Sequence, residues 1–285
     1  MDTAKAVALR AKNEHFSWKD CFEKFANPFS DEIRAEALPV LAVTTTSGTG
    51  SHVTQASVIS DSINKEKLTL FHSCLFPKES FVDPDFMRTV PQTTTAVTGF
   101  DAMCHAMESY FNPRANMLTE TLSLQAISII VETLPLVLED PENIELREKL
   151  AYADTLAGIC LSNAGAEAPH PIAETINGYF PKMAHGETLA LVYPNYLSHA
   201  STAIPNKIET LIQILKNYRP SKDTGSLGEL ASETMKDFLR AIGLDKPFTF
   251  AGDKDALVQE LKEKLFFNLP LTDSKQMQEI LAKSL

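Results

Sequence analysis

The sequence lacks the features that membrane, secreted and nucleic-acid-binding proteins share. No apolar run approaches the roughly 20 residues needed to span a bilayer, and the N-terminus has no apolar signal-peptide segment. Lysine and arginine number 26 against 37 aspartates and glutamates, which gives a formal net charge of −11. Nucleic acids and anionic membranes attract positive surfaces, so this balance argues against both as partners. The composition and the 285-residue length predict a soluble, cytoplasmic, enzyme-sized protein.

Cysteine is scarce, and its spacing excludes one kind of metal site. None of the four cysteines forms a C-x-x-C pair, so a zinc site built from thiolates is not expected. Without a secretion signal, the cysteines are interpreted as reduced, buried thiols of a cytoplasmic protein. They are Cys21, Cys74, Cys104 and Cys160.

The standard glycine-rich nucleotide motifs are also missing. Residues 47–51, Ser-Gly-Thr-Gly-Ser, come nearest to one, but Val53 stands where a dinucleotide fingerprint needs its third glycine. This loop follows an apolar run, and its backbone N–H groups and hydroxyls could cradle a phosphate. A plain tight turn is the other interpretation, and the residues themselves favour it.

Two regions of different character follow one another along the chain. Residues 2–11 predict a helix that Asp2 or Thr3 caps, and short apolar runs between turn formers predict strands. From Pro91 onward, apolar residues recur at spacings of three and four, which is typical of helices. We therefore predict a partial α/β dinucleotide-binding domain over residues 1–88 and an all-helical domain over residues 89–285. The expected strands are 38–43, 53–59, 68–72 and 80–83.

Asp101 and His105 suggest a metal site. They are four residues apart in a helical segment, so both side chains leave one face of the helix about one turn apart. That arrangement suits a bidentate metal ligand pair. Taken alone, a local hydrogen bond on a helix surface is the stronger interpretation.

His170 and His185 enlarge this set. His170 lies between two prolines after an apolar helical stretch, and His185 precedes Gly186 at the expected start of a helix. A buried imidazole needs a partner, and three imidazoles with one carboxylate suit Zn²⁺ or Fe²⁺ better than Mg²⁺ or Ca²⁺. Cys104 is expected to be a core residue. Four other histidines lack such surroundings and are predicted to lie on the surface or in loops: His15, His52, His72 and His199.

Together these segments resemble the iron-containing (group III) alcohol dehydrogenase family. The similarity lies in residues 42–54, in residues 98–110 around the D-x-x-x-H motif, and in two later histidine motifs, 162–172 and 184–186. The match is specific in order, spacing and flanking residues, although it becomes faint after about residue 200. The resemblance implies a dehydroquinate synthase-like architecture, an α/β remnant followed by a mostly α-helical metal-binding domain.

The resemblance also implies roles for particular residues. It places the metal, Fe²⁺ or Zn²⁺, on Asp101, His105, His170 and His185. It places NAD or NADP near a threonine-rich loop and a lysine, which here are Thr45, Thr46, Gly48, Thr49 and Lys67. In the family, the helix that corresponds to residues 2–11 follows a glycine-rich turn that holds the pyrophosphate. The chain is therefore expected to lack most of the N-terminal nucleotide-binding domain.

Two further departures from the family pattern are expected to matter. His52 stands where the family has glutamate. Glu174 stands where it has a second histidine, four residues after His170. On a helix, Glu174 would share a face with His170 and could accept a hydrogen bond or relay a proton; a solvated glutamate is the alternative.

The resemblance implies that the metal polarises the oxygen of a small alcohol or aldehyde while hydride passes to or from the nicotinamide. It is also compatible with a homodimer. Two alternatives stay open. One is a truncated metal-binding pseudo-enzyme or fragment unable to bind NAD(P). The other is a metal-dependent hydrolase or lyase with Glu174 as its base.

Overall fold

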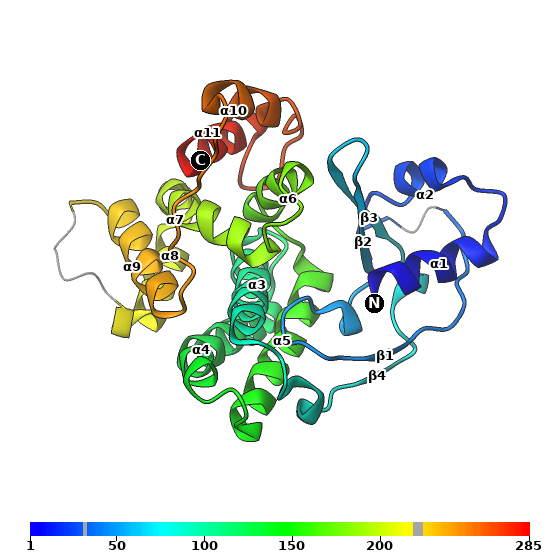
Figure 1. Cartoon of the computed structure of the whole chain (residues 1–285), viewed down its shortest axis with the longest axis horizontal. Helices are drawn as coiled ribbons and strands as arrows, with labels where there is room; N and C mark the ends of the chain where they lie inside the picture. The colour runs from blue at the N-terminus through cyan, green and yellow to red at the C-terminus, as the bar shows by residue number, and fades with distance from the viewer. Residues whose placement is uncertain (31–32, 219–224) are drawn as a thin grey trace.

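The structure, a computed structural model, describes residues 1–30, 33–218 and 225–285, and it has two regions of different architecture (Figure 1). The first combines two helices, α1 (Asp2–Lys12) and α2 (Trp18–Lys24), with four short strands. From residue 92 onward the regular elements in the described part of the chain are all helical. The predicted fold class, an α/β region followed by a mostly helical one, is confirmed.

The four strands form two separate pairs. Strand β1 (Leu41–Val43) pairs in parallel with β4 (Glu79–Phe81), and β2 (Ala56–Asp61) forms an antiparallel hairpin with β3 (Glu66–Phe71). The strand predicted over 53–59 begins late, because Ser51–Val53 instead form a 3-10 turn, η1. Two further 3-10 turns are η2 (Ser73–Leu75) and η3 (Pro84–Met87).

The helical region is built around α3, and its elements agree with the predicted helical periodicity. Helices α4 and α5 pack on α3 and on each other, while α7 contacts α3, α6 and α9. The elements are α3 (Gln92–Phe111), α4 (Met117–Glu139), α5 (Ile144–Ala164), α6 (Pro169–Tyr179), α7 (His185–Ala203), α8 (Pro205–Ile214), η4 (Lys216–Tyr218), α9 (Leu227–Ala241), α10 (Lys254–Lys262) and α11 (Ser274–Ser284).

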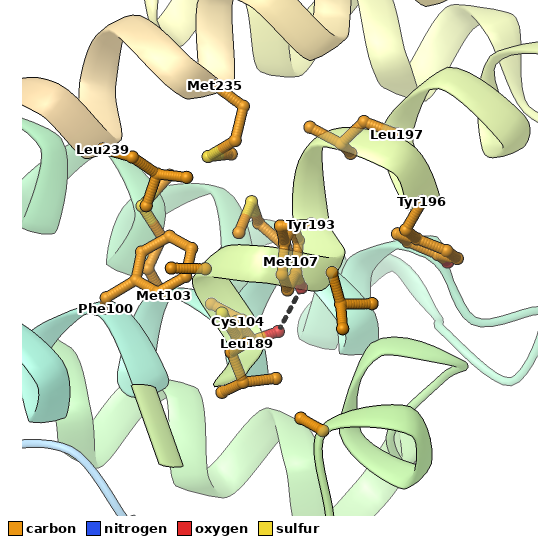
Figure 2. Packing of buried hydrophobic residues seen from close by; sticks show 14 of the residues in the cluster. Phe100, Met103, Cys104, Met107, Leu189, Tyr193, Tyr196, Leu197, Met235 and Leu239 are labelled. Carbon is orange, nitrogen blue, oxygen red and sulfur yellow. Dashed lines mark hydrogen bonds between the residues drawn. The ribbon is translucent and has the colours of Figure 1, made fainter. Parts of the chain in front are cut away.

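The main hydrophobic core lies where α3, α7 and α9 meet. Figure 2 shows Phe100 and Met103 of α3 near Met235 and Leu239 of α9, and the ring of Phe100 makes an edge contact with Tyr193 of α7. Cys104 is fully buried in this core, as predicted. A smaller core under α1 joins residues of α1 and α2 to Leu70 and Leu75. The helical region and the α/β region therefore each have a hydrophobic core of their own.

Helix α4 departs from one expectation. Its 23 residues have a mean hydropathy of 1.7 in their most apolar window, so by length and composition alone it could cross a membrane. The sequence had suggested that no segment approaches that length of apolar residues. In the structure α4 packs against α3 and α5, with Ile127, Ile130 and Leu134 fully buried. Burial in the helix bundle accounts for part of its apolar character, since 44% of that window is buried.

Two contacts bring the α/β region against the helices. The first is between α6 and β3 of the β2–β3 hairpin, whose other strand, β2, contacts α1 (Figure 1). The loop that contains η1 packs on α5. The boundary predicted near residue 89 falls between η3 and α3, and the division into two domains stays a prediction.

Candidate metal centre

Asp101 lies in the middle of α3, and three imidazoles converge on one of its oxygens. Asp101 Oδ1 is 3.7 Å from Nε2 of His105, 3.4 Å from Nε2 of His170 and 3.8 Å from Nε2 of His185. Asp101, His105 and His170 are buried, and His185 is mostly so. The structure therefore brings together all four residues that the sequence proposed as ligands.

The hydrogen bonds on the far side of two rings determine what faces Asp101. His170 Nδ1 is 2.7 Å from Glu108 Oε1, and His185 Nδ1 is 2.9 Å from Asn177 Oδ1. Both partners are acceptors, so each Nδ1 carries the proton and each Nε2 presents a lone pair. Asp101 Oδ1 and His170 Nε2 are buried without a hydrogen-bond partner in the described structure. A positive charge between these two atoms, either a proton on His170 Nε2 or a metal ion, would satisfy both of them.

The spacing fits a transition-metal ion. Ligand atoms about 2.1 Å from a tetrahedral ion lie about 3.4 Å from one another, close to the separations from Asp101 Oδ1. The ligand atoms of Asp101, His170 and His185 all lie within 4.8 Å of one another. His105 does not belong to that set, although its Nε2 approaches Asp101. Mixed imidazole and carboxylate donors suit Zn²⁺ or Fe²⁺. The ligand assignment stays a prediction.

Burial and charge keep three of the four candidate ligands in their metal-binding forms, and His170 is the exception. Burial alone would raise the pKa of Asp101, but the neighbouring imidazoles hold it well below its usual range. Burial lowers the pKa of His105, and it lowers that of His185 to about 3. Burial would also lower the pKa of His170, but Glu108 and Asp101 raise it well above its usual value. A bound cation would take the place of that extra proton.

Local sequence explains how the ligands reach one point. Asp101 and His105 share a face of α3, as their spacing predicts. His170 is the second residue of α6, and His185 is the first residue of α7. A Cβ at Gly186 would lie 2.1 Å from Val97 O of α3, so only glycine lets the start of α7 approach α3 this closely. The His-Gly motif thus has a packing reason.

The small-residue loop faces inward, which differs from the phosphate cradle considered from the sequence. The Gly50 N–H donates to Asp154 Oδ1 of α5 over 3.0 Å, and the Ser51 hydroxyl donates to Asp2 Oδ1. These donors are therefore not available to a phosphate. Gly50 has a left-handed φ of 59°, and a Cβ on it would lie 2.7 Å from Gly158 Cα.

The other predicted cofactor residues are divided between the surface and the interior. Thr45 and Thr49 are exposed and Thr46 is partly buried, whereas Gly48 is buried against Thr98 of α3. Lys67 lies on β3, and its Nζ is 3.3 Å from Asn177 Oδ1, the atom that holds His185. Lys67 therefore lies beside the metal centre. Cofactor binding by these five residues stays a prediction.

Glu174 lies on α6, one turn after His170, as predicted. It is partly buried, and burial raises its pKa even though the positive charges of His170 and Lys67 oppose the shift. A carboxylate that readily takes a proton thus lies at the edge of the centre. A cavity of about 530 Å³ lies elsewhere, between the end of α1 and residues 33–36.

Sequence reasoning missed three residues of this region: Glu108, Asn177 and Asp154. Glu108 follows Asp101 by seven residues on α3 and so repeats the polar spacing of an otherwise apolar helix, a signal that could have found it. Asn177 likewise follows His170 by seven residues on α6. Asp154 carries no comparable signal, because it does not lie at helical spacing from another polar residue of the centre.

Two histidines predicted to lie on the surface or in loops are buried instead. His52 is 3% exposed, and its Nε2 lies 2.9 Å from the Thr155 hydroxyl. His72 is 7% exposed; it caps η2 and contacts Cys74. His72 forms polar contacts through both ring nitrogens, and His52 contacts a hydroxyl of α5. These contacts lower the free-energy cost of burying each imidazole. Cys74 is only partly buried, unlike the other three cysteines.

Asp154 makes stability depend on pH. Burial raises its pKa to about 7, although the backbone of Gly48 and Gly50 favours the charged form. Stability from the protonated side chain is complete below the unfolded pKa of about 4 and is lost as the pH rises through about 7. We expect Asp154→Asn, which keeps an acceptor for the Gly50 N–H, to increase the free energy of unfolding at about pH 8 but hardly at about pH 4. Urea denaturation at both pH values measures this, and an equal change at both would contradict it.

Comparison with known proteins places the chain among relatives. Residues 95–284 match the model of the Fe-containing alcohol dehydrogenase family, C-terminal, and residues 1–84 match that of iron-containing alcohol dehydrogenase. The chain belongs to the iron-containing alcohol dehydrogenase family. The resemblance proposed from the motifs is thus confirmed.

Curated members of this family align over much of the chain. The NAD-dependent methanol dehydrogenase of Bacillus methanolicus is 29% identical over 93% of the chain, and the 1,3-propanediol dehydrogenase of Citrobacter freundii is 31% identical over 90%. The 1-propanol dehydrogenase of Salmonella typhimurium is 38% identical over 67%. The chain spans 68%, 64% and 46% of the lengths of these three relatives.

Solved structures of the iron-containing alcohol dehydrogenase family share the fold. An archaeal alcohol dehydrogenase from a Red Sea brine pool superposes with a TM-score of 0.85 at 31% identity, over 100% of this chain and 74% of the other. A 1,3-propanediol oxidoreductase superposes with a TM-score of 0.84 at 25% identity, again over 100% of this chain and 74% of the other.

Proposed function

We propose that this chain interconverts an alcohol and the corresponding aldehyde or ketone by hydride transfer with NAD or NADP, using one Fe²⁺ or Zn²⁺ ion. The observation that carries the proposal is the convergence of three imidazole Nε2 atoms on the buried Asp101 Oδ1, an arrangement of ligands that suits a divalent ion. The names of the relatives support the reaction class. One is NAD-dependent, and the three act on methanol, 1,3-propanediol and 1-propanol.

Asp101, His105, His170 and His185 would hold the ion. When bound, such an ion supplies Lewis acidity, which lowers the pKa of an alcohol and favours its alkoxide. The protein would contribute the ion's position, because Glu108 and Asn177 fix the orientation of two of the imidazoles.

The nicotinamide cofactor would lie over the region between the small-residue loop and β3. Thr45 and Thr49 are exposed and Thr46 is partly buried, so their hydroxyls would be available to it, and Lys67 would offer the positive charge that an anionic cofactor requires. Because the Gly50 N–H is bonded to Asp154, we expect side chains rather than a backbone cradle to contact the cofactor.

Glu174 is proposed to accept the alcohol proton. Its raised pKa makes it a better base than an exposed glutamate, and it shares the face of α6 with His170. The nearby Lys67 is suited to stabilise the carboxylate before the proton arrives.

The test is to load the purified chain with Fe²⁺ or Zn²⁺ and follow nicotinamide absorbance with short primary alcohols. We expect metal-dependent turnover, and Glu174→Gln should lower kcat about 10²–10⁴-fold, the usual contribution of a general base. Metal content should stay unchanged. Glu148→Gln, at an exposed glutamate of α5, is the matched control. Metal binding without nicotinamide binding would instead indicate a metal-binding protein that is not a dehydrogenase.

A further inference from the structure

Glu108 is a buried carboxylate that hydrogen-bonds to His170, one of the proposed metal ligands. It is fully buried, one helical turn beyond His105 on α3. Its Oε1 lies 2.7 Å from His170 Nδ1 and accepts a hydrogen bond from the Tyr193 hydroxyl over 3.1 Å. Its Oε2 accepts the backbone N–H of Glu167 over 2.8 Å. With both oxygens accepting, Glu108 acts as an ionised carboxylate.

The partner of the second imidazole is different. His185 Nδ1 bonds to the neutral amide oxygen of Asn177, which also accepts from the Thr188 hydroxyl and from Lys67. An imidazole forms a stronger hydrogen bond to an ionised acceptor than to a neutral one. The stronger bond makes the opposite ring nitrogen a better electron-pair donor to a metal ion. The two imidazoles are therefore unequal as ligands.

Buried charge gives Glu108 a second effect. Asp101 and Glu108 are both buried, and one divalent ion neutralises the pair. Two other buried carboxyl groups nearby take up a proton more readily, because burial raises the pKa of Asp154 to about 7 and that of Glu167 to about 8. Lys67 and Glu174 at the edge of the centre offset each other. An uncompensated charge in such an interior costs several kcal/mol, so the balance matters.

We propose that Glu108 is a positioning residue that fixes His170 with its Nε2 toward the metal and supplies the second negative charge that a divalent ion neutralises. This inference rests on the proposed metal centre. It predicts that divalent-ion affinity depends on a residue that never contacts the ion.

The experiment measures Zn²⁺ affinity of the whole chain by competition with a chromophoric chelator. Glu108→Gln should weaken binding about 10–100-fold, as loss of the group that orients a ligand usually does. Glu167→Gln is the control for a carboxyl-to-amide change in the same buried surroundings, because Glu167 is equally buried and adjacent to Glu108 but bonds to no imidazole and, with its pKa raised to about 8, carries no charge near neutral pH. It should leave the affinity unchanged. Equal affinities in wild type and Glu108→Gln would overturn the proposal.

A second measurement covers the case in which Glu108→Gln does not fold. In the wild-type Zn²⁺ form, nitrogen-15 NMR of labelled histidine should show His170 coordinated through Nε2, with a strongly deshielded proton on Nδ1. Coordination through Nδ1 would overturn the role of Glu108. A wild-type chain that binds no Zn²⁺ would instead refute the proposed function itself.

Discussion

Replacing Asp101 with asparagine is expected to abolish tight metal binding and, with it, turnover. Asp101 Oδ1 is the one atom that all three imidazole Nε2 atoms approach, within 3.4–3.8 Å. The amide removes the charge and leaves a buried site without its anionic ligand. Removing one partner of a buried charge pair costs about 3–5 kcal/mol, which corresponds to about 10²–10⁴-fold in affinity. Elemental analysis after dialysis and chelator competition measure the loss.

Asp255→Asn is the control for this experiment. Asp255 is an exposed aspartate in the first turn of α10, so the same chemical change there removes a charge without touching the centre. Circular dichroism of both variants establishes that they are folded. Full metal content in Asp101→Asn would refute the assignment of Asp101 as a ligand, whatever the activity.

Replacing Lys5 with methionine is expected to destabilise the protein more than any other single change in the α/β region. Lys5 lies on α1 and is fully buried, and its Nζ donates to the backbone carbonyls of Ser51, Thr54 and Ala56. Methionine fills the same space but leaves three acceptors without a donor. At about 1–3 kcal/mol for each unsatisfied buried group, partly relieved by water, we expect a loss of about 3–5 kcal/mol. Denaturant unfolding measures it.

Lys12→Met isolates the effect of the three carbonyls, because Lys12 lies on the same helix with its side chain exposed. The free energy of unfolding of that variant should lie within about 0.5 kcal/mol of the wild-type value, as is usual for surface changes. A similarly small loss for Lys5→Met would mean that the loop carbonyls find other donors. The same pair of variants tests whether α1 supports residues 51–56, because the carbonyls that Lys5 binds belong to that segment.

Short-range patterns in the sequence predicted the strands and the long helices, and they suggested half of the candidate metal centre, although a local hydrogen bond was the stronger interpretation of that pair alone. The spacing of Asp101 and His105 on an apolar helix is a local property, so it survives in the folded chain. His170 and His185 could be joined to them only through the family resemblance, because no periodicity links residues so far apart in sequence. The helices were predictable for the same reason as the first pair.

What could not be predicted depends on tertiary packing. His52 and His72 were expected at the surface or in loops; both lie in turns or loops, but a partner elsewhere in the chain makes their burial favourable. The small-residue loop left a phosphate cradle open beside the favoured tight turn, and the hydrogen bond from the Gly50 N–H to Asp154 of α5 argues against the cradle. The partners of a polar residue depend on the tertiary structure, whereas apolar periodicity can be observed in consecutive residues of the sequence.

The contact between Gly50 and Gly158 has a consequence for motion. Backbone meets backbone there, so no side chain can change rotamer to absorb a displacement. Asp154 and the Ser162 hydroxyl bond the same loop to α5 at Gly50 and Val53. We therefore expect the loop and α5 to move as one rigid body. A hinge that opened the α/β region would have to lie elsewhere, and the chain between η3 and α3 is the direct covalent link that could bend.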